Sequence, residues 1–139
     1  MRLVIGGACQ GKLAYAKDSY GISDGWVDGR SCSREDLNVC RGIHHFHEYI
    51  RRMISGDGSD LWTGELTEVE SKAEDFVREL LQKNPDIVIV SNELGYGLVP
   101  IEKQDRLWRE TVGRICICLA READEVVRVV CGMGMKIKS

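Results

Sequence analysis

The sequence predicts an α/β fold with a mostly parallel central sheet, and three observations support this. Short apolar segments that suit strands alternate along the chain with longer segments of helical periodicity. Residues 86–91, DIVIVS, are almost continuously apolar and rich in β-branched residues, which is typical of a strand buried on both faces of a parallel sheet. The length of 139 residues suits one hydrophobic core, so we expect a single domain over residues 1–139.

The first half of the chain predicts two strand–helix units. RLVIGG at 2–7 is a strand stopped by glycines, and GKLAYAKDSYG at 11–21 is a helix closed by Gly21. Residues 22–36 are rich in Gly, Ser and Asp and predict a connection with one short strand near Trp26. LNVC at 37–40 is expected to be a strand that leads into a helix ending at the glycines 56 and 58. The buried face of that helix is predicted to hold Ile43, His47, Ile50 and Ile54.

The second half is more regular. Thr67 and Glu70 form a capping-box pattern for a helix over 67–83, which the segment NPD terminates. Its apolar stripe is formed by Val69, Ala73, Phe76, Val77, Leu80 and Leu81. After the strand at 86–91 come a loop to residue 100, a long helix over about 101–123 and a last apolar strand, DEVVRVVCG.

The first loop has the spacing of a phosphate-binding loop, with Gly6 followed five residues later by Gly11-Lys12. Glycines let the backbone approach phosphate closely, the amides at a helix N-terminus bind the anion, and the lysine ammonium reaches the outer phosphates. The predicted nucleotide contacts are Gly6, Gly7, Ala8, Cys9, Gln10, Gly11, Lys12 and Leu13. We therefore expect a three-layer P-loop NTPase-type fold that binds a nucleotide. The alternative is a glycine turn that merely joins a strand to a helix.

Leu13 departs from the usual loop, which places a serine or threonine hydroxyl there as a magnesium ligand. Leucine has no oxygen to offer. We therefore expect a weak contribution of Mg²⁺ to nucleotide binding.

Composition excludes several function classes. A formal net charge of −3 gives no basic footprint for nucleic acid. No run of about 18 apolar residues predicts a membrane span, and the N-terminus does not resemble a signal peptide, so we expect a cytoplasmic protein. The six cysteines form no Cys-x-x-Cys pair, which indicates reduced thiols and no structural zinc. Cys9 could be an activated thiol, although filler of the loop is the simpler interpretation.

Three histidines lie at positions 44, 45 and 47. His47 falls on the apolar stripe and is interpreted as a packing residue. His44 and His45 are expected at the rim of the site, with His45 kept as a candidate nucleophile. No metal site is expected, because adjacent histidines point to different sides of a helix and His44 with His47 would need further ligands.

Four segments in order carry a resemblance to a known family: GGACQGK at 6–12, NELGYGLVP at 92–100, GRICICLAREADEVVRVVCG at 113–132, and KIK near the end. Together they resemble the adenosylcobinamide kinase / adenosylcobinamide-phosphate guanylyltransferase family. The resemblance implies a P-loop domain that binds GTP or ATP and phosphorylates adenosylcobinamide. It also implies transfer of GMP to that phosphate through a guanylylated histidine, often in a homotrimer, with nucleotide and cobinamide as partners.

Two departures from the family pattern leave the activity open. The stretch after the first helix is short and lacks the segment that carries the family's histidine nucleophile. LNVC aligns with the family's strand ending in Asp-Cys, so Cys40 matches and Val39 replaces the acidic residue. Either the protein retains one of the two transfer activities, or it is a nucleotide-binding or regulatory protein without turnover.

Asn92 and Glu93 follow the buried strand, where ligands bind in open α/β sheets. Glu93 is the candidate general base or water-mediated magnesium contact, and Asn92 is the second candidate catalytic residue. The alternative for the pair is a strand-end turn with a capping asparagine. On the next helix, an arginine among Arg106, Arg109 and Arg114 could reach phosphate, with a solvated helix face as the alternative.

Overall fold

The computed structural model describes residues 1–55, 66–94 and 102–139. The elements in chain order are β1 (Arg2–Gly6), α1 (Lys12–Tyr20), β2 (Trp26–Asp28), α2 (Arg34–Val39), β3 (Gly42–His44), α3 (Phe46–Ser55), α4 (Leu66–Lys83), β4 (Val88–Asn92), α5 (Lys103–Glu122), β5 (Glu125–Val130) and β6 (Met133–Lys138).

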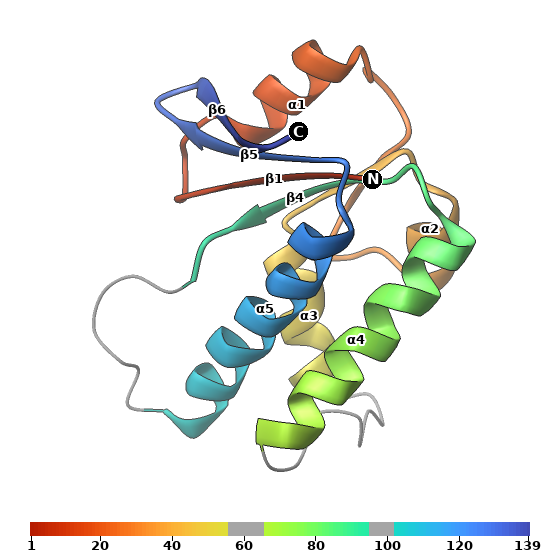
Figure 1. Cartoon of the computed structure of the whole chain (residues 1–139), viewed down its shortest axis with the longest axis vertical. Helices are drawn as coiled ribbons and strands as arrows, with labels where there is room; N and C mark the ends of the chain where they lie inside the picture. Colours follow the sequence, from red (N-terminus) through yellow and green to blue (C-terminus); the bar gives the residue numbers. More distant parts are fainter. Residues whose placement is uncertain (56–65, 95–101) are drawn as a thin grey trace.

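The strands form one six-stranded sheet in the order β2-β3-β4-β1-β5-β6. The first five are parallel, and β6 pairs antiparallel with β5. Helix α1 covers one face of the sheet, and α3, α4 and α5 cover the other, which gives three layers (Figure 1). The predicted α/β class and mostly parallel sheet are confirmed. The edge strand β6 was not predicted.

Two cores follow from these layers. The smaller core lies under α1 and joins Ala16 and Ile22 to sheet residues such as Val4 and Val90. The larger core lies under the other helices and includes Phe46, Leu119 and the sheet residues Leu3 and Ile89. Because β4 contributes to both, Ile87 to Ile89 are fully buried, as the unbroken apolar run predicted.

The strand predicted at residues 37–40 is wrong. Helix α2 occupies this segment because Ser33 and Asp36 form a capping box that starts a helix in the loop-like composition before it. The strand follows two residues later as β3. Val39 is therefore the last residue of a helix, and 82% of its surface is exposed. It does not lie at the end of a strand, where the family alignment had placed it. The Asn84 side-chain amide donates to the carbonyls of Leu37 and Cys40 and fixes this end of α2.

The other predicted helices are confirmed with shifted bounds. Helix α3 begins at Phe46 and buries His47, Ile50 and Ile54 as expected, whereas Ile43 is buried in β3 instead. Helix α4 spans the predicted segment. The side chain of Thr67, the glycines 56 and 58, and the loop 95–101 lie outside the described part of the chain.

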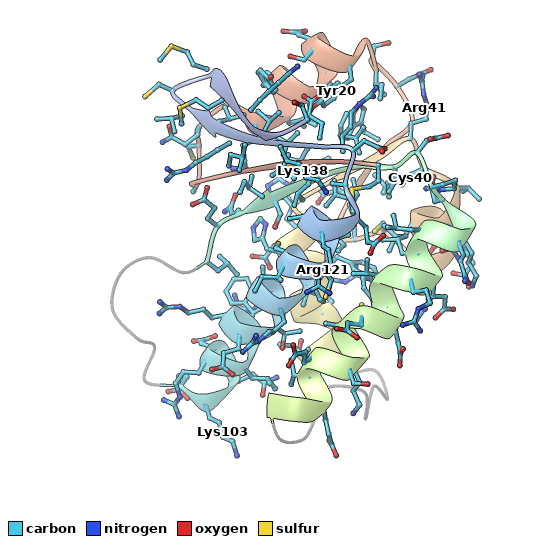
Figure 2. All side chains as sticks on the ribbon, in the orientation of Figure 1. Tyr20, Cys40, Arg41, Lys103, Arg121 and Lys138 are labelled. Atoms are coloured by element: carbon cyan, nitrogen blue, oxygen red, sulfur yellow. The ribbon has the colours of Figure 1, made fainter. Side chains whose placement is uncertain are left out.

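The C-terminal hairpin, β5 and β6, forms one edge of the sheet. After β5 the chain turns at Cys131 and Gly132, both with positive φ. The Lys138 ammonium donates to the carbonyls of Ala120 and Arg121 and so ties β6 to the end of α5 (Figure 2). All six cysteines lie in the described residues and are free thiols, as predicted. Among the described residues, no helix is long and apolar enough to cross a membrane.

Candidate functional site

The loop between β1 and α1 approaches the neighbouring strand closely. A Cβ at Gly6 would lie 2.5 Å from the Val129 carbonyl oxygen, so any side chain there would displace the backbone. Gly11 has a φ of 82° and precedes the first residue of α1. Cys9 also has a positive φ, 57°, which few non-glycine residues adopt. The close approach at Gly6 and the positive φ of Cys9 and Gly11 therefore shape the loop between β1 and α1.

Lys12 is the first residue of α1 and is 9% exposed. Its ammonium donates to the Gly7 carbonyl oxygen at 2.6 Å, which places the charge beneath the loop backbone. Burial lowers the pKa of Lys12, whereas electrostatic interactions with the Cys9 and Glu93 side chains raise it and so oppose that shift. The site thus holds a poorly solvated cation next to the N-terminus of a helix, an arrangement that attracts an anion.

A second tether to the loop comes from the C-terminal hairpin. The Gly132 amide donates to the Gln10 carbonyl at 2.8 Å, and the Cys131 amide donates to the Gln10 side-chain oxygen at 2.7 Å. Gln10 was predicted as a nucleotide contact, and this positioning role was not. The sequence gives only a weak signal for this positioning role of Gln10, because the role depends on the hairpin that follows β5.

A cavity of about 290 Å³ opens beside the loop. It is lined by Ala8, Cys9, Gln10, Gly11, Lys12, Leu13, Ala14, His44, His45, His47, Val90, Ser91 and Asn92. The fold therefore joins the predicted loop residues to Asn92 at the end of β4 and to the three histidines, which lie between the end of β3 and the start of α3. Gly6 and Gly7 lie at the strand end that supports the loop.

Glu93 faces a different partner. Its carboxylate lies 2.9 Å from Nε of Arg128 on β5, and its amide donates to the Gly6 carbonyl at 3.0 Å. A second cavity, of about 440 Å³, lies against Glu93. It is lined by Ile5, Asn92, Glu93, Leu94, Arg109, Glu110, Val112, Gly113 and Cys116. Asn92 lines both cavities, so the end of β4 separates them, and Arg109 is the arginine of the predicted three that reaches the second.

The histidines are not arranged as the sequence predicted. His44 is the last residue of β3, and His45 follows with a φ of 54° before α3 begins. The assumption that a helix runs through both is wrong, because β3 extends to His44. Instead of diverging, the two rings meet with their Nδ1 atoms 2.6 Å apart. Asp28 at the end of β2 approaches them, with one carboxylate oxygen 3.7 Å from Nδ1 of His45.

His47 is a buried structural residue, as predicted, and is 4% exposed. Its Nδ1 accepts a hydrogen bond from the Asn92 amide at 3.1 Å, and its carbonyl accepts one from the Trp108 indole at 2.7 Å. Burial lowers the pKa of His47 to about 4, helped by the nearby His45 and Lys12. A neutral His47 therefore fixes the position of Asn92.

Magnesium does not fit the loop in the manner of a complete phosphate site. Leu13 lines the cavity with an apolar side chain at the position where a hydroxyl would ligate the ion. Glu93, the other candidate, has its carboxylate paired with Arg128. The loop cavity combines the Lys12 ammonium with the N-terminus of α1, and this combination suits an anionic group better than a hard cation.

Comparison with known proteins places the chain in a family. The family model described as cobinamide kinase / cobinamide phosphate guanyltransferase matches residues 48–137. The chain belongs to the cobinamide kinase / cobinamide phosphate guanyltransferase family. The match contains β4, Asn92, Glu93 and α5 but begins after the phosphate loop. The resemblance noted in the sequence is thereby confirmed at the level of the family.

Two curated relatives share the same printed name, bifunctional adenosylcobalamin biosynthesis protein CobU. The protein of Salmonella typhimurium is 48% identical over 52 residues, and that of Escherichia coli is 46% identical over 52 residues. In each case the alignment covers 37% of this chain and 29% of the relative. The chain thus matches less than a third of the length of these two relatives.

Proposed function

We propose that residues 6–13 bind the phosphates of GTP or ATP and that the protein transfers a phosphoryl group or GMP to cobinamide in cobalamin biosynthesis. The observation that carries this proposal is Lys12, a buried ammonium at the N-terminus of α1 beside a cavity lined by the loop. Membership of the family supports the pathway, and the loop supports the nucleotide.

The chain's own residues suggest how the two substrates would be held. The loop amides and Lys12 would bind the outer phosphates and draw negative charge away from the phosphorus under attack. The larger cavity on the other side of Asn92 would hold the reacting end of the acceptor. Asn92 lies at the boundary and would orient the transferred group. Glu93 would accept the proton of the attacking hydroxyl, with Arg128 holding its carboxylate in place.

A second candidate is a nucleotide-binding or regulatory protein without turnover. The observation that favours it is Leu13, because a loop without the hydroxyl ligand holds magnesium poorly and magnesium offsets the charge that develops during transfer. Both candidates predict nucleotide binding, and they differ in whether product forms.

We also propose a homo-oligomer, a trimer by the family resemblance. The apolar side chains along the edge strand β6 support self-association, since Met133, Met135 and Ile137 are each more than half exposed. Sedimentation equilibrium would give the mass of the particle. A Met135→Lys variant should dissociate the oligomer, and a monomeric parent protein would reject it.

The test of the function is calorimetry with GTP, ATP and cobinamide, followed by a product assay. Binding of a nucleoside triphosphate with formation of phosphorylated or guanylylated cobinamide supports the enzyme. Nucleotide binding without product over long incubation supports the second candidate. Absence of nucleotide binding would reject both.

A further inference from the structure

The cluster formed by Asp28, His44 and His45 has no role in the function proposed above. Asp28 and His44 are direct partners in the register of β2 and β3, so their side chains leave the sheet on the same face. His45 adds a third group from the next position. Its ligand atom and those of Asp28 and His44 all lie within 4.8 Å of one another.

The backbone around the cluster is shaped to bring these groups together. His45 has a φ of 54°, in the left-handed region that non-glycine residues avoid, and such conformations concentrate at functional sites. A Cβ at Gly29 would lie 2.2 Å from the His45 carbonyl oxygen, so glycine is required for the end of β2 to approach this turn. The Gly29 amide donates to the His44 carbonyl at 2.8 Å and locks the approach.

We propose that Asp28, His44 and His45 bind a divalent transition-metal ion of the class that imidazole prefers, such as Zn²⁺, Co²⁺ or Fe²⁺. Two histidines and one carboxylate form a recognised ligand set that leaves coordination positions open. Two nitrogens bound at about 2.0–2.1 Å to one ion are separated by about 2.9–3.3 Å. The Nδ1 atoms are 2.6 Å apart, so a small rotation of the imidazole rings accommodates the ion.

An ion held by these residues would lie next to the loop cavity. His44 and His45 line the same cavity as Lys12 and Leu13. A phosphate oxygen of the nucleotide would then complete the coordination sphere of the ion. The phosphates would in this way contact a cation that needs no ligand at position 13. This last step rests on the proposed nucleotide binding, whereas the three-residue metal site does not.

The charged groups that face the cluster of Asp28, His44 and His45 influence its affinity for a metal ion. Arg30 binds the Asp28 carboxylate through its Nε and a terminal nitrogen, at 2.7–3.1 Å, and holds the pKa of Asp28 down to about 2. The Arg30 guanidinium occupies the Asp28 carboxylate oxygens that a metal ion would need, and its positive charge repels the ion. Burial lowers the pKa of His44, and the positive charges of Arg30 and Lys17 act in the same direction. Arg30 is therefore the main competitor, and its removal should tighten metal binding.

The experiment is a Co²⁺ titration of the metal-free protein without nucleotide, followed by visible absorption spectroscopy. We expect one ion per chain and bands that report nitrogen ligands. His44→Gln, His45→Asn and Asp28→Asn should each weaken binding by more than the roughly tenfold to hundredfold loss typical of outer-sphere changes. Asparagine at position 45 tolerates the left-handed backbone. Arg30→Ala should strengthen binding severalfold.

Asp24→Asn is the matched control, because Asp24 is an exposed carboxylate just before β2 that pairs with Arg41 and is not part of the cluster. It should bind Co²⁺ as the parent does. Unchanged Co²⁺ binding in the three ligand variants, or no binding by the parent, would overturn the proposal. Calorimetry with GTP and ATP on the same samples keeps the two proposals separate. Co²⁺ binding that depends on Asp28, His44 and His45 in a protein that binds no nucleotide would reject the proposed function and support the metal site.

Discussion

Glu93 follows β4 and Arg128 lies in β5, and the two side chains meet at 2.9 Å across β1, the strand between β4 and β5. The ion pair therefore crosses the carboxyl end of β1, where the phosphate loop begins. Glu93 is largely buried and Arg128 is 40% exposed. Because the Glu93 amide also donates to the Gly6 carbonyl, this contact couples the second cavity to the start of the loop.

This pair allows a structural role of Glu93 to be separated from a catalytic one. Glu93→Gln should destabilise the protein by about 1–2 kcal/mol, since it leaves a guanidinium with a weaker partner at a partly solvated site. Arg128→Met should cost a similar amount. If Glu93 is the general base, Glu93→Gln should lose transfer activity at least about a hundredfold, whereas Arg128→Met should lose much less. Equal activity losses in both variants would show that Glu93 acts only by holding Arg128.

Lys12→Ala should weaken binding of GTP and ATP roughly tenfold to hundredfold, because it removes a charge-assisted contact to phosphate worth about 1.5–3 kcal/mol. Calorimetry measures the loss. Lys17→Ala is the control, since Lys17 lies in the last turn of the same helix and does not line the loop cavity. Equal affinity of parent and Lys12→Ala, with the control unchanged, would remove the loop from the nucleotide site.

His47 should make the stability depend on pH. Its pKa is about 4 in the folded protein and about 6.5 in an unfolded chain. The folded state thus keeps a neutral ring that the unfolded chain protonates, so the contribution is complete above about pH 6.5. It is lost as pH falls towards about 4, by up to about 3 kcal/mol.

The measurement for His47 is urea unfolding between pH 4 and pH 7. His47→Asn is the comparison, because its side-chain oxygen can still accept from the Asn92 amide and does not titrate. We expect a lower but flatter stability profile in this variant. A variant that loses stability with acid as steeply as the parent would assign the pH dependence to other groups.

No GMP–histidine adduct should accumulate. The segment that carries the family's histidine nucleophile has no counterpart after the first helix of this sequence. The Nδ1 atoms of His44 and His45 are also engaged with each other, and that of His47 accepts from the Asn92 amide. Incubation with GTP followed by intact-mass measurement tests this. A mass increase corresponding to GMP that disappears in His44→Ala or His45→Ala would contradict the prediction and assign a nucleophile.

How far the sequence could predict this molecule depended on whether the signal was local. The strand β4 and helix α5 have continuous apolar or helical patterns, and both were found. Helix α2 was missed because Leu37 and Val39 suggested a strand, although Ser33 and Asp36 already held the capping signal. Local capping chemistry outweighed the β-branched character of a short segment.

The cluster of histidines could not be derived in the same way. Its geometry needs the register that places Asp28 beside His44, and that register comes from sheet packing between distant segments. The left-handed turn at His45 has no distinct signature in the sequence either. By contrast, the strand and helix on either side of the first loop were predicted from local patterns of apolar residues and glycines, and both are present as β1 and α1.

Leu13→Ser should increase the dependence of nucleotide binding on magnesium. In the parent protein the position lines the loop cavity but offers no oxygen, so Mg²⁺ can be held only by phosphates and water. Binding should therefore change little between magnesium and chelator. Serine would restore a ligand that bridges the ion to the loop, and affinity with Mg²⁺ should rise at least about threefold over affinity with chelator. Nucleotide titrations of both variants, with Leu13→Ala as the control for lost bulk, measure the difference. A strong magnesium requirement in the parent that serine leaves unchanged would assign the ion to groups outside the loop.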